Sequence, residues 1–264
     1  MFGRITPVVK TLLLINIGIL VIQSFLALPL VELFGLRYIF AEQFVPYQFF
    51  TYMFVHSGFW HLLGNMFALF IFGPMLEHYM GANRLLLFYT ICGLGAGALY
   101  SGVNFYEIQQ VEQAYESFTR DPSPEKFLNF IEDNARGRLT AEGYEFVHET
   151  FPANPDNQVY IQQAAEDMRR IYEQQKNLPM VGASGAVFGI LMAFGLLFPN
   201  LELMLLFPPI PIKAKYLVLF YGGFEVYSLI NQRPDDNVAH LAHLGGMLFA
   251  FVLIKWWGIK GPYN

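Results

Sequence analysis

Charged residues are scarce in this sequence. Asp, Glu, Lys and Arg together make up 14% of its 264 residues, against about 25% in an average soluble domain. Hydrophobic residues reach 55%. This composition is typical of an all-α polytopic membrane protein, whose main environment is the lipid bilayer. The net charge of −5 argues against nucleic acid as a partner.

Cysteine and the common cofactor motifs are also lacking. Cys92 is the only cysteine, so no intramolecular disulfide can form, and its place in an apolar run predicts buried packing. The sequence contains no His-Glu-x-x-His motif, no zinc-type cysteine pair, no phosphate-binding loop and no internal repeat. We therefore expect neither a metal nor a cofactor.

The acidic residues gather in one region. Residues 105–178 contain 14 Asp and Glu against 7 Lys and Arg, which leaves a net charge of +2 for the rest of the chain. We expect membrane segments in residues 1–104 and 179–264, separated by an acidic, mostly helical extracytoplasmic insertion at 105–178.

Six hydrophobic segments are long enough to be membrane spans, at about 20 residues each. They are Thr11–Val31, Phe59–Tyr79, Arg84–Asn104, Ala183–Pro199, Lys213–Ile230 and Val238–Trp257. An even number of spans puts both termini on one side, and basic residues of short loops favour the cytoplasm. Most of them lie on the side of the termini: Arg4, Lys10, Arg84, Lys213, Lys215, Lys255 and Lys260, against Arg37 and Arg233 on the other. Both termini are predicted to be cytoplasmic.

The second, fourth and sixth spans must then begin on the same face. His61, Ser184 and His243 each lie in about the first two turns of one of these spans, roughly 3 to 9 Å below its outer end. Polar residues inside a span are costly unless they face the bundle interior or water. These three residues are therefore the candidate functional site.

The insertion carries helix signals. Ser123 followed by Pro124 predicts a helix start, and Asn154 with Pro155 repeats the signal before a helix reaching about Lys176. Its charged residues indicate a solvated face rather than a specific binding surface. An apolar stripe at helical spacing predicts packing within the insertion or on the membrane part: Tyr160, Ala164, Met168, Ile171 and Tyr172.

Each candidate has a structural alternative. Ser184 stands among Gly and Ala, which also permit close packing of membrane helices. Glu225, inside the fifth span, could make a structural hydrogen bond or take part in catalysis. His240 and His243 share a helix face and could bind zinc with a third ligand such as His61, and a chelator would reveal such a site.

Three motifs, in order and on the expected spans, resemble those of the rhomboid family of intramembrane serine proteases. Gly182, Ala183, Ser184 and Gly185 resemble its Gly-x-Ser-Gly on the fourth span. His61 and Asn65 resemble its His-x-x-x-Asn on the second, and His243 followed by Gly246 resembles its histidine on the sixth.

The resemblance implies a six-helix bundle and assigns roles to residues. Ser184 would be the nucleophile and His243 the general base, with His243 preferred over His240. His61, Asn65 and the Ser184 amide would stabilise the oxyanion. The supporting residues would be Gly182 and Gly246 for close helix packing and Phe188 against the catalytic histidine.

Two further positions are compared with the family. Glu77 falls where the family tends to carry an acidic residue that stabilises the inner end of the second span. Tyr47 and Gln48 stand where the family often has Trp-Arg, so the outer loop must be anchored differently.

The expected function is that of an intramembrane serine endopeptidase of a bacterial inner membrane, with an active site that opens to the extracytoplasmic side. Its partners would be single-span or multi-span membrane protein substrates. Phe220, Phe224 and Tyr227 on the fifth span would be gating aromatics. The alternative is a catalytically inactive relative that binds membrane clients without cutting them.

Overall fold

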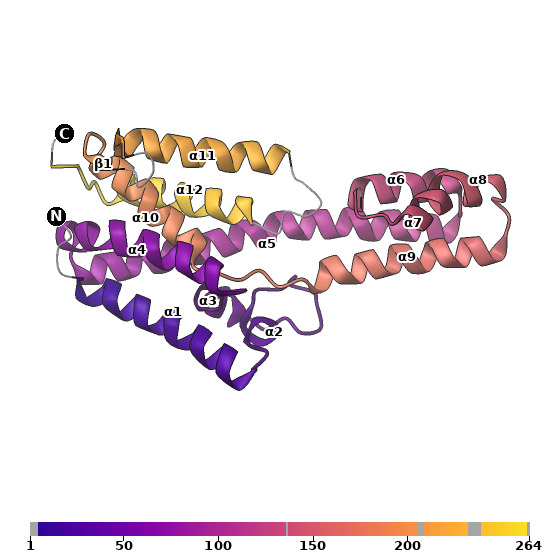
Figure 1. Cartoon of the computed structure of the whole chain (residues 1–264), viewed down its shortest axis with the longest axis horizontal. Helices are drawn as coiled ribbons and strands as arrows, with labels where there is room; N and C mark the ends of the chain where they lie inside the picture. The colour runs from indigo at the N-terminus through magenta and orange to yellow at the C-terminus, as the bar shows by residue number, and fades with distance from the viewer. Residues whose placement is uncertain (1–4, 136, 205–208, 232–238, 263–264) are drawn as a thin grey trace.

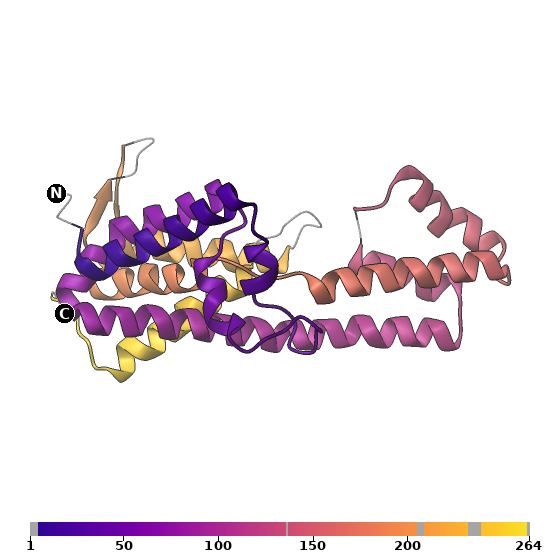
Figure 2. The ribbon, with the colours of Figure 1, turned by 90° about the horizontal axis from the view of Figure 1, so that it is seen from below.

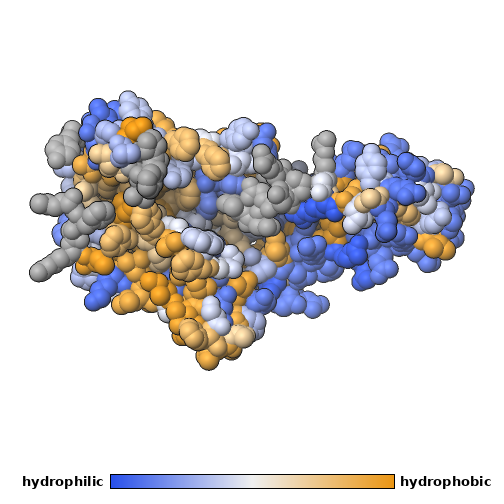
Figure 3. Space-filling model, viewed as in Figure 1, coloured by the Kyte–Doolittle hydropathy of each residue, from blue (hydrophilic) through white to orange (hydrophobic). Residues whose placement is uncertain are grey.

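The computed structural model describes residues 5–135, 137–204, 209–231 and 239–262. The molecule is elongated, with a bundle of helices at one end and a helical arm at the other (Figures 1 and 2). Apolar side chains dominate the surface of the bundle and hydrophilic ones that of the arm (Figure 3). The bundle contains α1 (Pro7–Leu26), α4 (Phe59–Met80), the first part of α5 (Ala82–Arg120), α10 (Ser184–Leu197), α11 (Ala214–Ile230) and α12 (His240–Trp256).

Each hydrophobic segment predicted from the sequence overlaps one of these helices. The first predicted span, Thr11–Val31, begins and ends later in the chain than α1. Pro7 is the first residue of the helix, and Ala27 ends it in a left-handed conformation with φ 49°. Among the described residues, three helices are long and apolar enough to cross a bilayer, α1, α4 and α5, and α10 and α12 are shorter apolar helices. The 14 residues of α10 measure about 21 Å, less than a hydrocarbon core of about 30 Å.

Alternate helices share their direction. Helices α4, α10 and α12 all begin at the end of the bundle that carries the arm, whereas α1 begins and α12 ends at the opposite end (Figures 1 and 2). Helix α10 lies inside, packed against α4, α5 and α12. Cys92 of α5 is buried in the same core, as its sequence context predicted.

The loop between α1 and α4 contains α2 (Leu30–Phe34), α3 (Gln48–Thr51) and the 3-10 helix η1 (Tyr52–Phe54). The buried Gln48 side chain anchors it, since its amide donates to the carbonyl of Gln43 at 3.0 Å. Leu36 and Met180 exchange two backbone hydrogen bonds of 2.8 Å. The loop is thereby fastened to the strand-like segment that leads into α10.

The arm continues the bundle without a break. Helix α5 has 39 residues and runs through the predicted boundary at 104/105, and α9 returns beside it (Figures 1 and 2). The arm elements after α5 are α6 (Pro124–Asn134), α7 (Ala141–Glu145), a π-helical turn η2 (Phe146–Thr150), α8 (Phe151–Ala153) and α9 (Gln158–Asn177).

Of the two helix starts predicted in the arm, that of α6 is confirmed and that of α9 is not. The Ser123 hydroxyl accepts from the Lys126 amide, which confirms the predicted start of α6. The start of α9 was wrong by one turn: Asn157, not Asn154, is the cap, and its side chain accepts from the Val159 amide at 3.0 Å.

The arm has its own hydrophobic core. Phe118, Phe127 and Phe151 are fully buried in it, and α9 contributes Ala164 and Met168 of the predicted stripe. The Tyr172 hydroxyl donates to Glu112 of α5 at 3.0 Å. Burial, and then the neighbouring carboxylate, raise the pKa of Tyr172, so its phenol stays protonated and α9 stays linked to α5.

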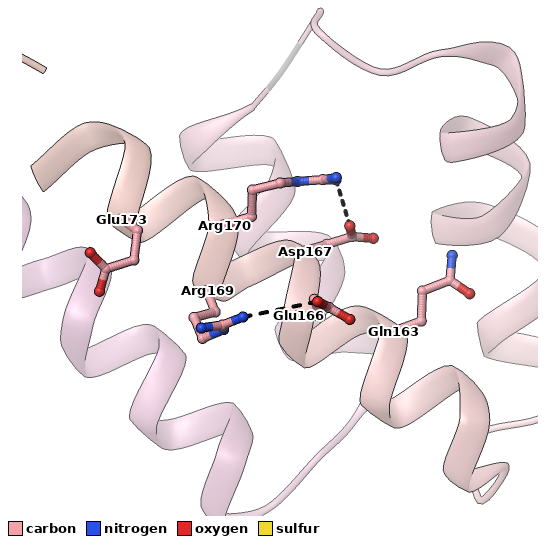
Figure 4. A pocket seen from close by; sticks show the side chains of 6 residues that line it. All are labelled: Gln163, Glu166, Asp167, Arg169, Arg170 and Glu173. Atoms are coloured by element: carbon pink, nitrogen blue, oxygen red, sulfur yellow. Dashed lines mark hydrogen bonds and ion pairs between the residues drawn. The ribbon is translucent and has the colours of Figure 1, made fainter. Parts of the chain in front are cut away.

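The opposite face of α9 is charged. Figure 4 shows two ion pairs there, Arg170 with Asp167 at 2.6 Å and Arg169 with Glu166 at 3.9 Å. They are exposed pairs within one helix, which contribute little to stability.

A short hairpin precedes α11. Strands β1 (Glu202–Met204) and β2 (Pro211–Lys213) pair antiparallel. Three residues used to place the predicted spans and their sides lie outside the described residues: Arg4, Arg233 and Val238.

Glu77 joins two helices of the bundle. Its carboxylate is 5% exposed and accepts from the amides of Val8 and Val9, both at 3.0 Å. Those amides belong to the first turn of α1. The N–H groups of this turn have no acceptors within the helix, and the positive end of the helix dipole lies there. The acid therefore caps α1 from α4.

We predict that Glu77→Gln lowers the thermal stability of the detergent-solubilised protein. The amide group can replace only one acceptor oxygen, so a buried backbone N–H is left without a partner, at a cost of about 1–3 kcal/mol. The exposed Glu132 provides a matched control, Glu132→Gln. Equal melting temperatures for the two variants would contradict the capping role.

Candidate active site

Ser184 is the first residue of α10. The chain turns into the helix at Gly182, whose φ of +121° strongly favours glycine and whose amide donates to the Tyr52 carbonyl at 2.9 Å. The half-buried Ser184 therefore sits among the first amides of a helix, which lack intrahelical acceptors. Such amides are suited to stabilising a developing negative charge.

Helices α10 and α12 touch through their backbones. A Cβ added to Gly246 would lie 1.8 Å from the Gly185 carbonyl oxygen, and one added to Gly185 would meet Ala96 of α5 at 2.5 Å. Only glycine permits this approach. Ser184 directly precedes Gly185 on α10, and His243 lies three residues before Gly246 on α12.

His243 is the fourth residue of α12 and is 8% exposed. The Phe188 ring, one turn after Ser184 on α10, stacks on its imidazole with centroids 4.2 Å apart and an interplanar angle of 6°. Within the part of the chain that the structure describes, no hydrogen bond joins Ser184 and His243. Catalytic hydrogen bonds are often long in a free enzyme and tighten in its complexes.

His61 and Asn65 come from the first two turns of α4. The Ser57 hydroxyl lies 3.0 Å from Nδ1 of His61, and Nε2 faces Gly182, where an added Cβ would be 2.6 Å away. Asn65 Nδ2 donates to the His61 carbonyl at 3.0 Å. One N–H of the Asn65 amide is committed to its own helix and the other is left for a ligand.

His56 adds an unexpected ring to the site. It is completely buried, its centroid is 5.0 Å from that of His61, and neither ring nitrogen has a hydrogen-bond partner among the described residues. The sequence analysis gave it no role. It forms the wall behind His61.

Glu225 makes a hydrogen bond inside the bundle, one of the two roles that the sequence had left open. Its Oε2 is 2.5 Å from Nδ1 of His240, within a hydrogen bond, and 3.0 Å from Nδ1 of His243, in ion-pair contact. All three side chains are buried, and their donor atoms lie within 4.8 Å of one another, the only such group of three in the described chain. The sequence had suggested His61 as a third metal ligand, and the structure places Glu225 there instead.

Comparison with known proteins gives the family. A model of the Rhomboid domain matches residues 43–108 and 159–258, more than half of the chain. The chain belongs to the rhomboid family. The stretch between the two matched parts, residues 109–158, contains the last part of α5 and the arm elements α6, α7, η2 and α8.

Relatives with curated names are organellar proteins. The chain is 26% identical over 217 residues to an uncharacterized mitochondrial rhomboid protein of Schizosaccharomyces pombe, covering 80% of this chain and 51% of the relative. It is 24% identical over 210 residues to the mitochondrial RHOMBOID-like protein 12 of Arabidopsis thaliana, covering 80% and 45%. The chain thus spans about half the length of these relatives.

We predict that Gly246→Ala prevents the labelling of Ser184 by a fluorophosphonate in this rhomboid protein. The added methyl group would overlap the Gly185 carbonyl oxygen, so α10 and α12 must separate and carry Ser184 away from His243. Gly18→Ala on α1, where a Cβ meets nothing within 4 Å, is the control. Labelling of the folded, monodisperse fraction by a fluorophosphonate is the measurement, and full labelling of Gly246→Ala would show that the contact is dispensable.

Proposed function

We propose that this rhomboid protein is an intramembrane serine endopeptidase with a Ser184–His243 dyad. The observation that carries the proposal is the position of Ser184 at the start of a buried helix that is in backbone contact with the helix of His243. A packing role alone would explain the glycines. It would not require a histidine stacked on Phe188, one turn after Ser184 on α10.

The chemistry follows from the two side chains. Ser184 Oγ attacks the carbonyl carbon of the scissile peptide bond while Nε2 of His243 accepts its proton. The tetrahedral intermediate collapses when the imidazolium returns this proton to the leaving nitrogen. Water then repeats the sequence on the acyl-enzyme and frees Ser184.

The oxyanion of that intermediate requires preorganised donors. The Ser184 amide lies in the first turn of α10, and His61 presents Nε2 on the side of Gly182. When the Ser57 hydroxyl donates to Nδ1 of His61, the ring proton resides on Nε2, which becomes a donor. Asn65 supplies its remaining N–H.

The substrates are transmembrane segments of single-span or multi-span membrane proteins. Because α10 is about 9 Å shorter than the hydrocarbon core, Ser184 lies below the membrane surface when the other end of α10 reaches the opposite surface. A helical peptide bond is shielded there by its own hydrogen bonds. Segments that unwind readily are therefore the preferred substrates.

Helix α11 is the proposed gate. Phe220, Phe224 and Tyr227 are each more than half exposed on it, so they face outward from the bundle and would meet a segment approaching from lipid. Inward, α11 is seated by Val218 against Gly195 and by Gly222 against Met247.

The protein is placed in a membrane with both termini on one side and the arm on the other. Basic residues of short loops favour a cytoplasmic position of the termini, so the site would open to the extracytoplasmic side. The sequence led us to expect a bacterial inner membrane, whereas the two relatives described above are mitochondrial proteins. Fractionation of cells of the native source would show in which membrane the protein lies.

We predict that Ser184→Ala abolishes cleavage of a single-span test substrate, with a loss of at least about 10³-fold, while the protein stays folded. Mass spectrometry after fluorophosphonate treatment should locate the adduct on Ser184 of the unmutated protein. Ser24→Ala, an exposed serine of α1, should cleave normally. Absence of both cleavage and adduct in the unmutated protein would instead favour an inactive, client-binding relative.

We further predict that His61→Ala lowers kcat by about 10²-fold and leaves KM nearly unchanged, because the lost donor acts on the oxyanion of the transition state. Initial rates across a range of substrate concentrations separate the two constants. A rise in KM with unchanged kcat would assign His61 to substrate binding.

A further inference from the structure

A buried carboxylate lies behind the proposed base. Glu225 of α11 and His240 of α12 are each 4% exposed, and both contact the same region as His243. Taking a charged carboxylate out of water is costly unless hydrogen bonds and opposite charge compensate it. In this structure its Oε2 is approached by Nδ1 of His240 at 2.5 Å and by Nδ1 of His243 at 3.0 Å.

These contacts determine which imidazole nitrogen carries the proton. A carboxylate next to Nδ1 favours the tautomer with hydrogen on Nδ1, so Nε2 of a neutral His243 keeps its lone pair. That is the form a general base needs. The carboxylate also stabilises the imidazolium that exists after His243 has accepted the Ser184 proton.

A metal ion fits the same atoms less well. Two nitrogen or oxygen ligands on a tetrahedral zinc ion at about 2.0–2.1 Å are about 3.3 Å apart. The 2.5 Å separation between Glu225 and His240 is that of a short, charge-assisted hydrogen bond. The arrangement is that of a carboxylate shared by two imidazoles.

We propose that Glu225 is the third member of the catalytic group, a positioning residue that orients His243 through Nδ1, while His240 holds the carboxylate in place. The dyad of the proposed function is then the reacting part of a Ser184–His243–Glu225 arrangement. This inference rests on the proposed function, because it assigns a partner to the same base.

The contacts of His240 and His243 with Glu225 differ, in agreement with their different proposed roles. His240 forms the aligned hydrogen bond to Glu225, whereas His243 is at contact distance without that alignment. Phe188 of α10 stacks on His243, and Glu225 of α11 is the acidic member of the group that it forms with His240 and His243.

The test compares Glu225→Gln with Glu225→Asp in the full-length protein. We expect Glu225→Gln to lower kcat and the rate of Ser184 labelling by a fluorophosphonate by about 10- to 100-fold, with KM nearly unchanged, because the neutral amide no longer stabilises the imidazolium. Glu225→Asp retains the charge and should recover part of the rate. The dependence of labelling on pH should also move in Glu225→Gln.

Glu77→Gln is the matched control, since Glu77 is an equally buried carboxylate that contacts backbone amides of α1. It should lower the melting temperature and leave the labelling rate of the folded fraction unchanged. The proposal is overturned if Glu225→Gln behaves in the same way, or if a chelator abolishes labelling of the unmutated protein and Zn²⁺ restores it. Failure of Ser184 to label in the unmutated protein would instead refute the proposed function itself.

Discussion

The direct contact between the backbones of α10 and α12 is the constraint on which the site depends. Gly246 lies so close to the Gly185 carbonyl oxygen that it has no room for a Cβ, and a Cβ on Gly185 would meet Ala96 of α5. Ser184 precedes one glycine and His243 lies three residues before the other. Their proximity is therefore fixed by rigid helices rather than by a loop, as the preorganisation of a catalytic group requires.

The arm is mechanically connected to this centre. Helix α5 passes from the bundle into the arm without interruption, and α9 returns to a short extended segment that ends at Ser184. Arg37 of the outer loop donates to the carbonyls of Asn177 and Glu32, and Met180 pairs with Leu36. The extended segment between α9 and α10 is thus held to the outer loop by backbone hydrogen bonds, Leu36 with Met180 and Gly182 with Tyr52.

The sequence predicted what depends on local pattern. Apolar runs located the bundle helices, Ser123 with Pro124 located α6, and the motifs brought His61 and Ser184 to one end of the bundle. It could not give the contacts of Glu225, because the phase of α11 relative to α12 depends on packing between helices far apart in the chain. For the same reason the anchoring by Gln48 was invisible: an amide in a loop has many possible partners until the loop is folded.

Helix α11 carries aromatic rings on its outward side and Glu225 on its inward side, and the proposed roles of the two sides require opposite movements of the helix. Its aromatic rings face outward, where under the proposed function they would meet a segment approaching from lipid. Its inward Glu225 contacts both histidines of α12 and requires α11 to stay close. An outward movement of α11 by a few ångströms would exceed the reach of a hydrogen bond and leave His243 without its carboxylate. Under the proposed mechanism His243 is fully oriented only while α11 lies against α12, so the chemical step would take place in the closed arrangement and substrate entry in an open one.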